Sequence, residues 1–150
     1  MDQIKKKITI ITVVKNAENT LENCIKSVLS QNYNNLEYIV IDGNSSDRTK
    51  EIINKYKNNI SRIIIEGDDG IWDAMNKGIK LADGEIIGFL NSDDYYFNNT
   101  LEIVNNYFSK NNIDFLFGSV EKYKLIHGYS SWKIYFSFGF YTSHSVGFFI

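Results

Sequence analysis

The residues Ile8–Val14 (ITIITVV) form a run of seven apolar or β-branched residues, and this run most constrains the fold. Val, Ile and Thr favour extended backbone, and an uninterrupted run of this kind is typical of a strand covered on both faces. Lysines precede the run, as in a signal peptide, but Lys15 and Asn16 follow it where a cleavage site needs small residues. The sequence therefore predicts a buried first strand.

Strand and helix patterns alternate after this run. Apolar residues at helical spacing, such as Leu21, Ile25 and Val28, separate segments that resemble short strands. An alternating order of this kind implies a mostly parallel sheet with helices on both faces, which is a three-layer α/β/α, Rossmann-like architecture. The predicted strands cover residues 8–14, 36–41, 62–66, 85–91 and 114–120.

Polar residues before the helical patterns predict the helix starts. Asn19 and Glu22 are spaced as a capping box, Ser45 or Ser46 is placed to cap the second helix, and Asn99 is placed to cap the last. The third helix is expected over residues 71–82, before Gly84.

Length, charge and cysteine usage limit the class of protein. The 150 residues suit one domain, and the net charge of −2 argues against a sequence-independent nucleic-acid binder. The single cysteine, Cys24, lies on the apolar face of a predicted helix and is expected to be a buried structural thiol. No apolar stretch approaches the roughly 18 residues of a membrane helix, so we expect a soluble cytoplasmic protein. The pattern weakens after residue 121 and the end is apolar, so we interpret residues 1–150 as the front part of a larger domain.

Acidic residues follow three of the predicted strands. Asp42 ends the second strand, Asp68 and Asp69 follow the third, and Asp93 and Asp94 follow the fourth. Each could be a turn-forming aspartate. Ligands of open α/β sheets bind at the carboxyl ends of the strands, however, and these residues share that edge. Their common placement favours a binding site.

The type of ligand follows from the carboxylates and from what the first loop lacks. Carboxylate oxygens favour hard cations such as Mg²⁺ or Mn²⁺, which usually bridge to phosphates. The glycine-rich dinucleotide fingerprint is absent after the first strand, where VVKNAEN stands, and there is no P-loop. The sequence therefore predicts a phosphate compound held through a metal ion.

Three motifs in order resemble those of the family 2 glycosyltransferases, which have the GT-A nucleotide-sugar-binding fold. They are ITIITVVKNAENTLENCIKSVLSQ, LEYIVIDGNSSDRT and GDDGIWDAMNKGIKLADGEIIGFLNSDD. The last is similar to a block in the branch that builds bacterial surface polysaccharides. The resemblance covers residues 8–97 well, and SHSVGFF near the end of the chain is loosely similar to a further segment of the family.

The resemblance implies roles for individual residues. Asp42 is expected near the base and ribose of the nucleotide, Asp93 at the ribose or sugar, and Asp94 at the metal that bridges the diphosphate. Asp69 and Asp73 are favoured over Trp72 and Met75 in the segment that lines the sugar-diphosphate side. His144 is expected on the acceptor side. The full set expected at the nucleotide sugar is Thr12, Val14, Asn16, Asp42, Asp69, Asp73, Asn76, Lys77, Asn91, Ser92 and Asp93.

The implied activity is a glycosyltransferase of the hexosyltransferase type. It would use Mn²⁺ or Mg²⁺ to move a sugar from a nucleotide-diphosphate donor, a UDP-sugar, to a hydroxyl of a glycan or lipid-linked acceptor. The transfer would invert the anomeric configuration and serve surface polysaccharide biosynthesis. Association with the inner face of the membrane remains open.

The chain also departs from the family pattern. Gly43 stands where many relatives have a second aspartate, and Lys15 stands where many have a tyrosine, which leaves the base specificity open.

No match to the family's catalytic base is found in the sequence, and we expect this base beyond Ile150. Glu121, His127 and His144 are local substitutes that are better explained as structural residues or acceptor contacts.

Two other functions are compatible with the fold. A phosphoacceptor signalling domain would need an acidic pair after the first strand, where Lys15 and Asn16 stand. A non-catalytic module that binds a nucleotide sugar, as a shortened transferase, stays open because no base is found.

Overall fold

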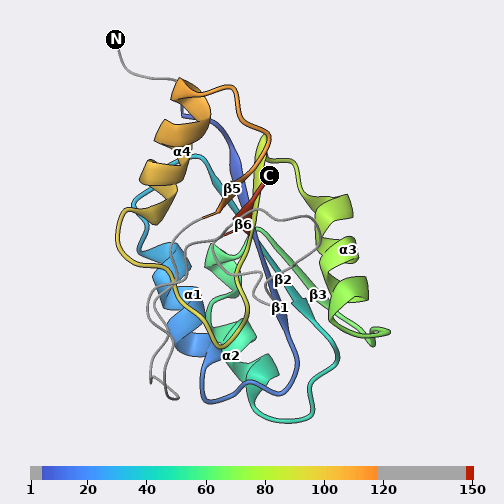
Figure 1. Ribbon diagram of the computed structural model, residues 1–150. Coiled ribbons are helices and arrows are strands. Elements are labelled where there is room, and N and C mark those ends of the chain that lie inside the picture. The colour runs from blue at the N-terminus through green and yellow to red at the C-terminus, as the bar shows by residue number, and fades with distance from the viewer. Residues whose placement is uncertain (1–4, 118–147) are drawn as a thin grey trace, which may run out of the picture.

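The structure is a computed structural model, and it describes residues 5–117 and 148–150. These residues form one sheet of six strands in the order β3-β2-β1-β4-β6-β5 (Figure 1). The first four strands are parallel, and β6 runs antiparallel to both β4 and β5. The prediction of a mostly parallel α/β sheet is confirmed. The strands are β1 Ile8–Val14, β2 Leu36–Asp42, β3 Arg62–Ile65, β4 Ile86–Phe89, β5 Leu116–Phe117 and β6 Phe148–Phe149.

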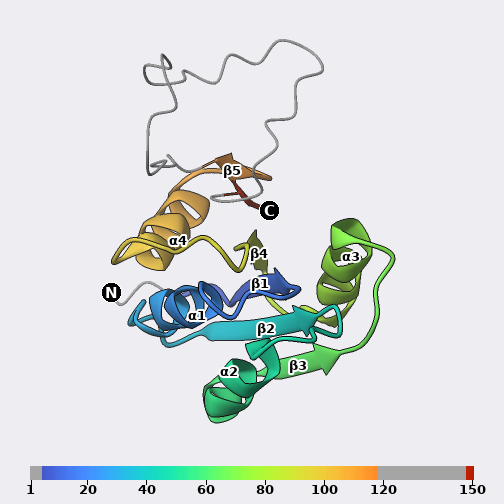
Figure 2. The same cartoon turned by 90° about the horizontal axis from the view of Figure 1, so that it is seen from below.

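Helices cover both faces of the sheet. Figure 2 shows α1, α2 and α4 on one face and α3 on the other, which gives the expected three layers. Among the described residues, no helix is long and apolar enough to cross a membrane. The helices are α1 Leu21–Leu29, α2 Thr49–Lys55, α3 Ile71–Leu81 and α4 Thr100–Lys110, with a 3₁₀ turn at Lys57–Asn59.

Strand β1 is the centre of the core. Every residue of β1 is buried, because alternate side chains enter two different hydrophobic clusters. Ile8 and Ile10 pack with α1, α2 and α4, whereas Ile11 and Val13 pack with α3. The strand pairs with β2 along its whole length and with β4 over its first half. The prediction of a strand covered on both faces is confirmed.

The predicted caps of the first two helices are wrong. Helix α1 follows Thr20 without a side-chain cap hydrogen bond, so Asn19 and Glu22 form no capping box. Glu22 instead accepts hydrogen bonds from Lys55 and Tyr56 on the other side of the α1–α2 contact. Because the Glu22 carboxylate binds these two side chains, it is not available to form the local capping box.

Ser45 and Ser46 also do not cap a helix. Helix α2 follows Arg48 and begins two residues later than a Ser46 cap would place it, because both serines bind the ends of β1 and β2 instead. Asn99 does precede α4, but it is in the left-handed region with a φ of 64° and forms no cap bond. The side chain of Gln31 takes over this role, since its Oε1 accepts the N–H of Leu101.

The last predicted strand, residues 114–120, is only partly described. Leu116–Phe117 form β5, while residues 118–120 lie outside the described residues, as do Glu121, His127 and His144.

Strand β6 was not expected, because two residues are too few to show a strand pattern. It inserts between β4 and β5 through the pairing of Phe149 with Gly88 and Leu116. Ile150 continues the contact with β4: its amide donates to the Ile87 carbonyl (2.9 Å), and its carbonyl accepts the Ile87 amide (2.6 Å). The end of the sequence is therefore part of the sheet.

A buried carboxylate, Glu37, binds residues from several elements at the edge of the sheet where the parallel strands begin. Glu37 is 5% exposed, and its Oε2 accepts hydrogen bonds from the Thr9 hydroxyl (2.6 Å) and the Asp83 amide (2.8 Å). Lys7 and Arg62 lie 3.8 and 3.6 Å from its Oε1. Burial opposes ionisation of Glu37, but the hydrogen bonds and the two cations outweigh it and lower the pKa of Glu37. Ionised Glu37 therefore stabilises the fold.

We expect Glu37→Gln to lower the free energy of unfolding by about 1–3 kcal/mol near neutral pH, since the charged acceptor loses its partners. A carboxyl with a lowered folded pKa contributes stability above its unfolded pKa and loses that contribution as the pH falls through the folded pKa. The difference between wild type and variant should therefore shrink in acid. Urea unfolding followed by circular dichroism from neutral pH down to about pH 3.5 measures this.

Glu51→Gln is the matched control. The Glu51 side chain is 72% exposed and pairs with Arg48 on the surface of α2. Its loss should change the unfolding free energy by less than about 0.5 kcal/mol at every pH. An equal pH dependence in both variants would contradict the assignment to Glu37.

Candidate functional site

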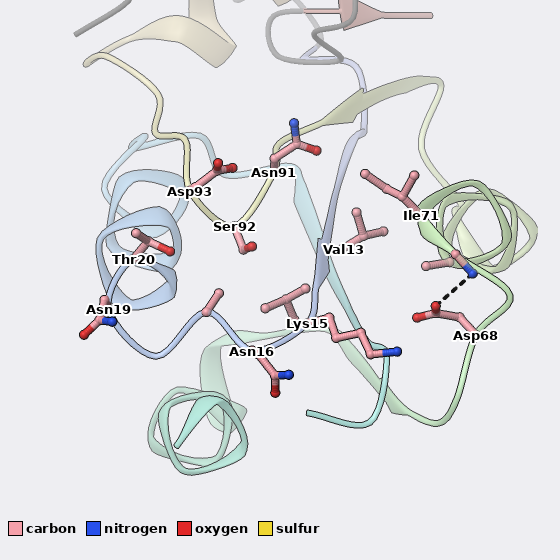
Figure 3. Close-up of a pocket in the computed structure, with 14 residues that line it drawn as sticks. Val13, Lys15, Asn16, Asn19, Thr20, Asp68, Ile71, Asn91, Ser92 and Asp93 are labelled. Atoms are coloured by element: carbon pink, nitrogen blue, oxygen red, sulfur yellow. Dashed lines mark hydrogen bonds between the residues drawn. The ribbon is translucent and has the colours of Figure 1, made fainter. Parts of the chain in front are cut away.

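A cavity of about 660 Å³ opens at the carboxyl edge of the sheet (Figure 3). It is lined by the loop after β1, the loop between β3 and α3, and the turn after β4. Parallel strands present their last residues at one edge, so these three segments meet although they are far apart in the sequence. The edge predicted from the aspartates is thus the edge that holds a cavity.

The loop after β1 is fixed to the loop after β2. Asn16 has a φ of 52°, a conformation that asparagine tolerates better than most residues, and its amide donates to the Ser45 hydroxyl (2.8 Å). The Asn16 Oδ1 in turn accepts the amide of Ser46 (2.8 Å). These bonds hold Val14 and Asn16, two of the expected donor-site residues, at the cavity wall.

Asp42 is fully buried at the end of β2 and does not line the cavity. Its Oδ1 accepts hydrogen bonds from the amide and the hydroxyl of Ser45. Its Oδ2 has no hydrogen-bond partner among the described residues. Buried polar atoms are nearly always paired, so this unpaired oxygen is an exception within the described core.

Gly43 allows two charged side chains to lie over the end of β2. A Cβ atom at Gly43 would come within 2.2 Å of the Asp68 Oδ2 and 3.3 Å of the Lys15 Cδ. Both side chains line the cavity, and Figure 3 shows them on the same side of it. Lys15 is the one cation among the cavity-lining residues that the structure describes. The two departures from the family pattern, Gly43 and Lys15, are therefore adjacent in space.

The turn after β4 carries the adjacent carboxylates. Asn91, Ser92 and Asp93 line the cavity, and Figure 3 shows Asp93 across it from Asp68. Asp94 is folded back towards Asn91: its amide donates to the Asn91 carbonyl (3.1 Å), and its Oδ2 accepts from the Asn91 side chain (3.4 Å). The two aspartates thus face different surroundings.

The donor set of this turn suits a hard divalent cation that also binds phosphate. No group of three or more Asp, Glu, His or Cys side chains is placed to hold a metal within residues 5–117 and 148–150. Mg²⁺ and Mn²⁺ in phosphate sites, however, often bind one or two carboxylates together with phosphate oxygens and water. Asp93 and Asp94 could supply those carboxylates.

A buried polar chain supports the turn from below. The Cys24 Sγ lies 3.4 Å from the Asn91 carbonyl, to which it donates, and 3.7 Å from the Thr12 hydroxyl. The Tyr38 hydroxyl donates to Thr12 at 3.1 Å. Thr12 was expected at the nucleotide sugar, but it is fully buried and contacts the site through Cys24.

Comparison with known proteins identifies the family. The profile of Glycosyl transferase family 2 matches residues 9–146. This chain belongs to that family. It has the GT-A fold, as its structural relatives do: the crystal structure of TarS residues 1–349 from S. aureus aligns with a TM-score of 0.71 at 26% identity, over 85% of this chain and 38% of that one.

Two Escherichia coli relatives carry names that state an activity. WfgD is 38% identical over 115 residues, which are 76% of this chain and 46% of WfgD. WfaP is 41% identical over 92 residues, which are 59% of this chain and 36% of WfaP. Both are named UDP-Glc:alpha-D-GlcNAc-diphosphoundecaprenol beta-1,3-glucosyltransferase. The chain thus spans less than half the length of these relatives.

The site of this family 2 member differs in detail from the expected residue set. Asp69, Asp73, Asn76 and Lys77 do not line the described cavity, and their part in donor binding stays a prediction. Asp68 does line it and was not included, although it is the first of the two aspartates that follow the third predicted strand. No signal in the sequence separates it from the adjacent Asp69, because both follow the third predicted strand.

The printed sequence contains no residue that matches the family's catalytic base. It was expected beyond Ile150, after the printed sequence, so its identity and position stay a prediction. Ile150 itself is bonded to β4 through the backbone of Ile87 and does not line the cavity. Among the described residues, the lining of the cavity thus holds none of the residues named as substitutes for the base.

The reactivity of the Cys24 thiol can test the packing beneath the site, because Cys24 is the only cysteine of the chain and all labelling reports on it. Burial raises the pKa of its thiol to about 12, although the hydrogen bond with Thr12 opposes this rise. We expect labelling by a thiol reagent near pH 8 to be at least roughly a hundredfold slower in the folded protein than in guanidinium chloride, since only the thiolate reacts. Equal rates before and after unfolding would contradict the buried position.

Proposed function

We propose that this protein binds a UDP-sugar in the cavity and transfers the sugar to a hydroxyl of a glycan or lipid-linked acceptor. The observation that carries the proposal is a cavity at the carboxyl edge of a GT-A sheet, with Asp93 on one side and Lys15 and Asp68 on the other. The names of WfgD and WfaP support a UDP-sugar donor and a lipid-linked acceptor. In this proposal the chain acts in the synthesis of surface polysaccharide.

The nucleoside would occupy the side of the cavity near the ends of β1 and β3. There Lys15 offers a hydrogen-bond donor and Asp68 an acceptor, so polar groups of the base or ribose could bind both. Lys15 cannot stack on a base as a tyrosine would. Base recognition would then depend on hydrogen bonds and on the apolar wall formed by Val13 and Ile71.

The diphosphate would lie at the turn after β4. Asp94, with Asp93 beside it, would hold Mn²⁺ or Mg²⁺, and the metal would offset the negative charge of the leaving diphosphate. Asp93, which faces the cavity, would also reach the ribose or sugar. Asn91 and Ser92 supply neutral hydrogen-bonding groups along the same wall.

The acceptor half of the reaction belongs to residues outside the described part of the chain. An acceptor hydroxyl would attack the anomeric carbon from the face opposite the diphosphate, and a carboxylate base beyond Ile150 would take its proton. One such displacement inverts the anomeric configuration. His144 remains a candidate acceptor contact, and the reaction would occur in the cytoplasm, at the membrane surface where the acceptor is lipid-linked.

Metal-dependent donor binding is the first test. We expect UDP-glucose to bind the wild type at least about tenfold more tightly with Mn²⁺ than with a chelator, because the cation neutralises the diphosphate. Asp94→Asn and Asp93→Asn should remove most of this gain. Isothermal titration calorimetry with UDP-glucose in both conditions measures it.

Asp114→Asn is the control, since Asp114 is exposed and lies outside the cavity. Binding that ignores the metal and both aspartates at the turn would overturn the metal assignment. Donor binding without any sugar transfer to a lipid-linked acceptor would instead favour a non-catalytic module that binds nucleotide sugars.

Gly43→Ala tests the nucleoside side of the cavity. The new methyl group would displace the Asp68 carboxylate, which can rotate away, so we expect a stability loss below about 1 kcal/mol. UDP-glucose binding should weaken by roughly tenfold, because Asp68 no longer holds its place. Titration of the variant at saturating Mn²⁺ isolates this effect from the metal.

Gly67→Ala is the matched control in the same loop as Asp68. A Cβ atom there meets no atom of the described residues within 4 Å, so binding should stay within about twofold of wild type. Equal binding by the two alanine variants would contradict the placement of the nucleoside beside Asp68.

A further inference from the structure

The loop between β3 and α3 presents Asp68 to the cavity with few contacts of its own. Its residues 66–70 are exposed except for Asp68, which is partly buried. The Glu66 amide donates to the Asp42 carbonyl (3.0 Å) at the start of the loop, and the Gly70 amide donates to the Asp68 Oδ1 (3.0 Å) at its end. The middle of the loop needs other contacts to keep one shape.

The side chain of Lys77 supplies those contacts from the third helix. Its Nζ lies 3.0 Å from the Gly67 carbonyl, 2.9 Å from the Glu66 carboxylate and 3.0 Å from the Asp73 Oδ2. An ammonium group has three N–H donors, and each of these acceptors can take one. The bonds to Glu66 and Asp73 raise the pKa of Lys77, so it is charged at every physiological pH.

Asp73 connects the same set of bonds to Asp69, the loop residue that follows Asp68. Its Oδ2 accepts the Asp69 amide at 3.2 Å in addition to the Lys77 ammonium. The pKa of Asp73 is lowered by these two bonds. Lys77 and Asp73 therefore connect α3 to the two loop residues that flank Asp68.

Helix α3 is a rigid support for this arrangement. Gly78, directly after Lys77, packs so closely on β1 that a Cβ atom would come within 2.5 Å of the Ile11 Cγ2. Ala74 and Met75, on the same side of the helix, are buried against the sheet. The loop is therefore held by a helix that cannot shift easily relative to β1.

We propose that Lys77 is a positioning residue: together with Asp73 it holds the β3–α3 loop so that Asp68 faces the cavity, and it affects donor binding through Asp68. The inference rests on the proposed function for its ligand. Lys77 has all three donors engaged and does not line the cavity, so it would not bind the donor directly.

A double-mutant cycle between Lys77 and Asp68 tests the proposal. We expect Lys77→Met to weaken UDP-glucose binding by roughly tenfold, and Asp68→Asn to weaken it by a similar factor. If Lys77 acts through Asp68, the double variant should bind no more weakly than Asp68→Asn alone. Multiplied losses would show that Lys77 acts independently and would overturn the proposal.

Two further variants separate positioning from a loss of folding. Lys77→Arg keeps the charge and several donors, so it should restore most of the binding. Lys80→Met removes an exposed lysine of the same helix that has no hydrogen bond or ion pair within the described residues, and it should bind as wild type does. Circular dichroism melting of each variant shows whether the fold is intact. Failure of the arginine variant, or a matching loss in Lys80→Met, would contradict a specific role.

Hydrogen exchange followed by mass spectrometry gives a readout that needs no ligand. The Asp69 and Gly70 amides, which are bonded to Asp73 and Asp68, should exchange faster in Lys77→Met than in wild type or Lys80→Met. Unchanged exchange in this segment would overturn the positioning role. A wild type that binds no UDP-sugar would instead overturn the proposed function and leave the exchange result to decide the role of Lys77.

Discussion

The burial of β1 on both faces is the constraint on which the rest of the structure depends. Its alternate side chains enter two hydrophobic clusters, and these clusters fix α1 on one side and α3 on the other. The loop that leaves β1 must then emerge between the two helix layers, at the carboxyl edge. The cavity lies at this edge, and the loop that leaves β1 lines it.

Among the described residues that line the cavity, Lys15 carries the one positive charge, and Asp68 and Asp93 carry negative charges. Asp68 and Lys15 lie together because Gly43 lacks a side chain, while Asp93 lies across the cavity. A second aspartate in place of Gly43 would collide with Asp68 and add a like charge beside it. The positions of Lys15 and Asp68 therefore depend on the absence of a side chain at Gly43. A change at one of these three residues is expected to require changes at the others.

The sequence predicts the parts of this protein that depend on periodicity and on strand ends. The alternation of strands and helices, the burial of Ile8–Val14 and the shared edge of the aspartates all follow from local patterns. The capping of α1 and α2 does not, because tertiary partners override the local caps: Glu22 binds Lys55 instead of forming a capping box. The choice between Asp68 and Asp69 also needs the structure, since adjacent residues of a loop point in different directions. Strand β6 is two residues long and is defined by its partners alone.

The two ends of β2 differ in how their buried carboxylates are partnered. Each end carries a buried carboxylate on the same strand. Glu37, at the amino end, has hydrogen bonds or cations at both oxygens, as stability requires of a buried charge. Asp42, at the carboxyl end, has one oxygen without a partner among the described residues. Sequences that fold well satisfy such groups except where another role competes. The unsatisfied acceptor therefore lies at the carboxyl edge of the sheet, where the cavity opens, although Asp42 itself is fully buried and does not line the cavity.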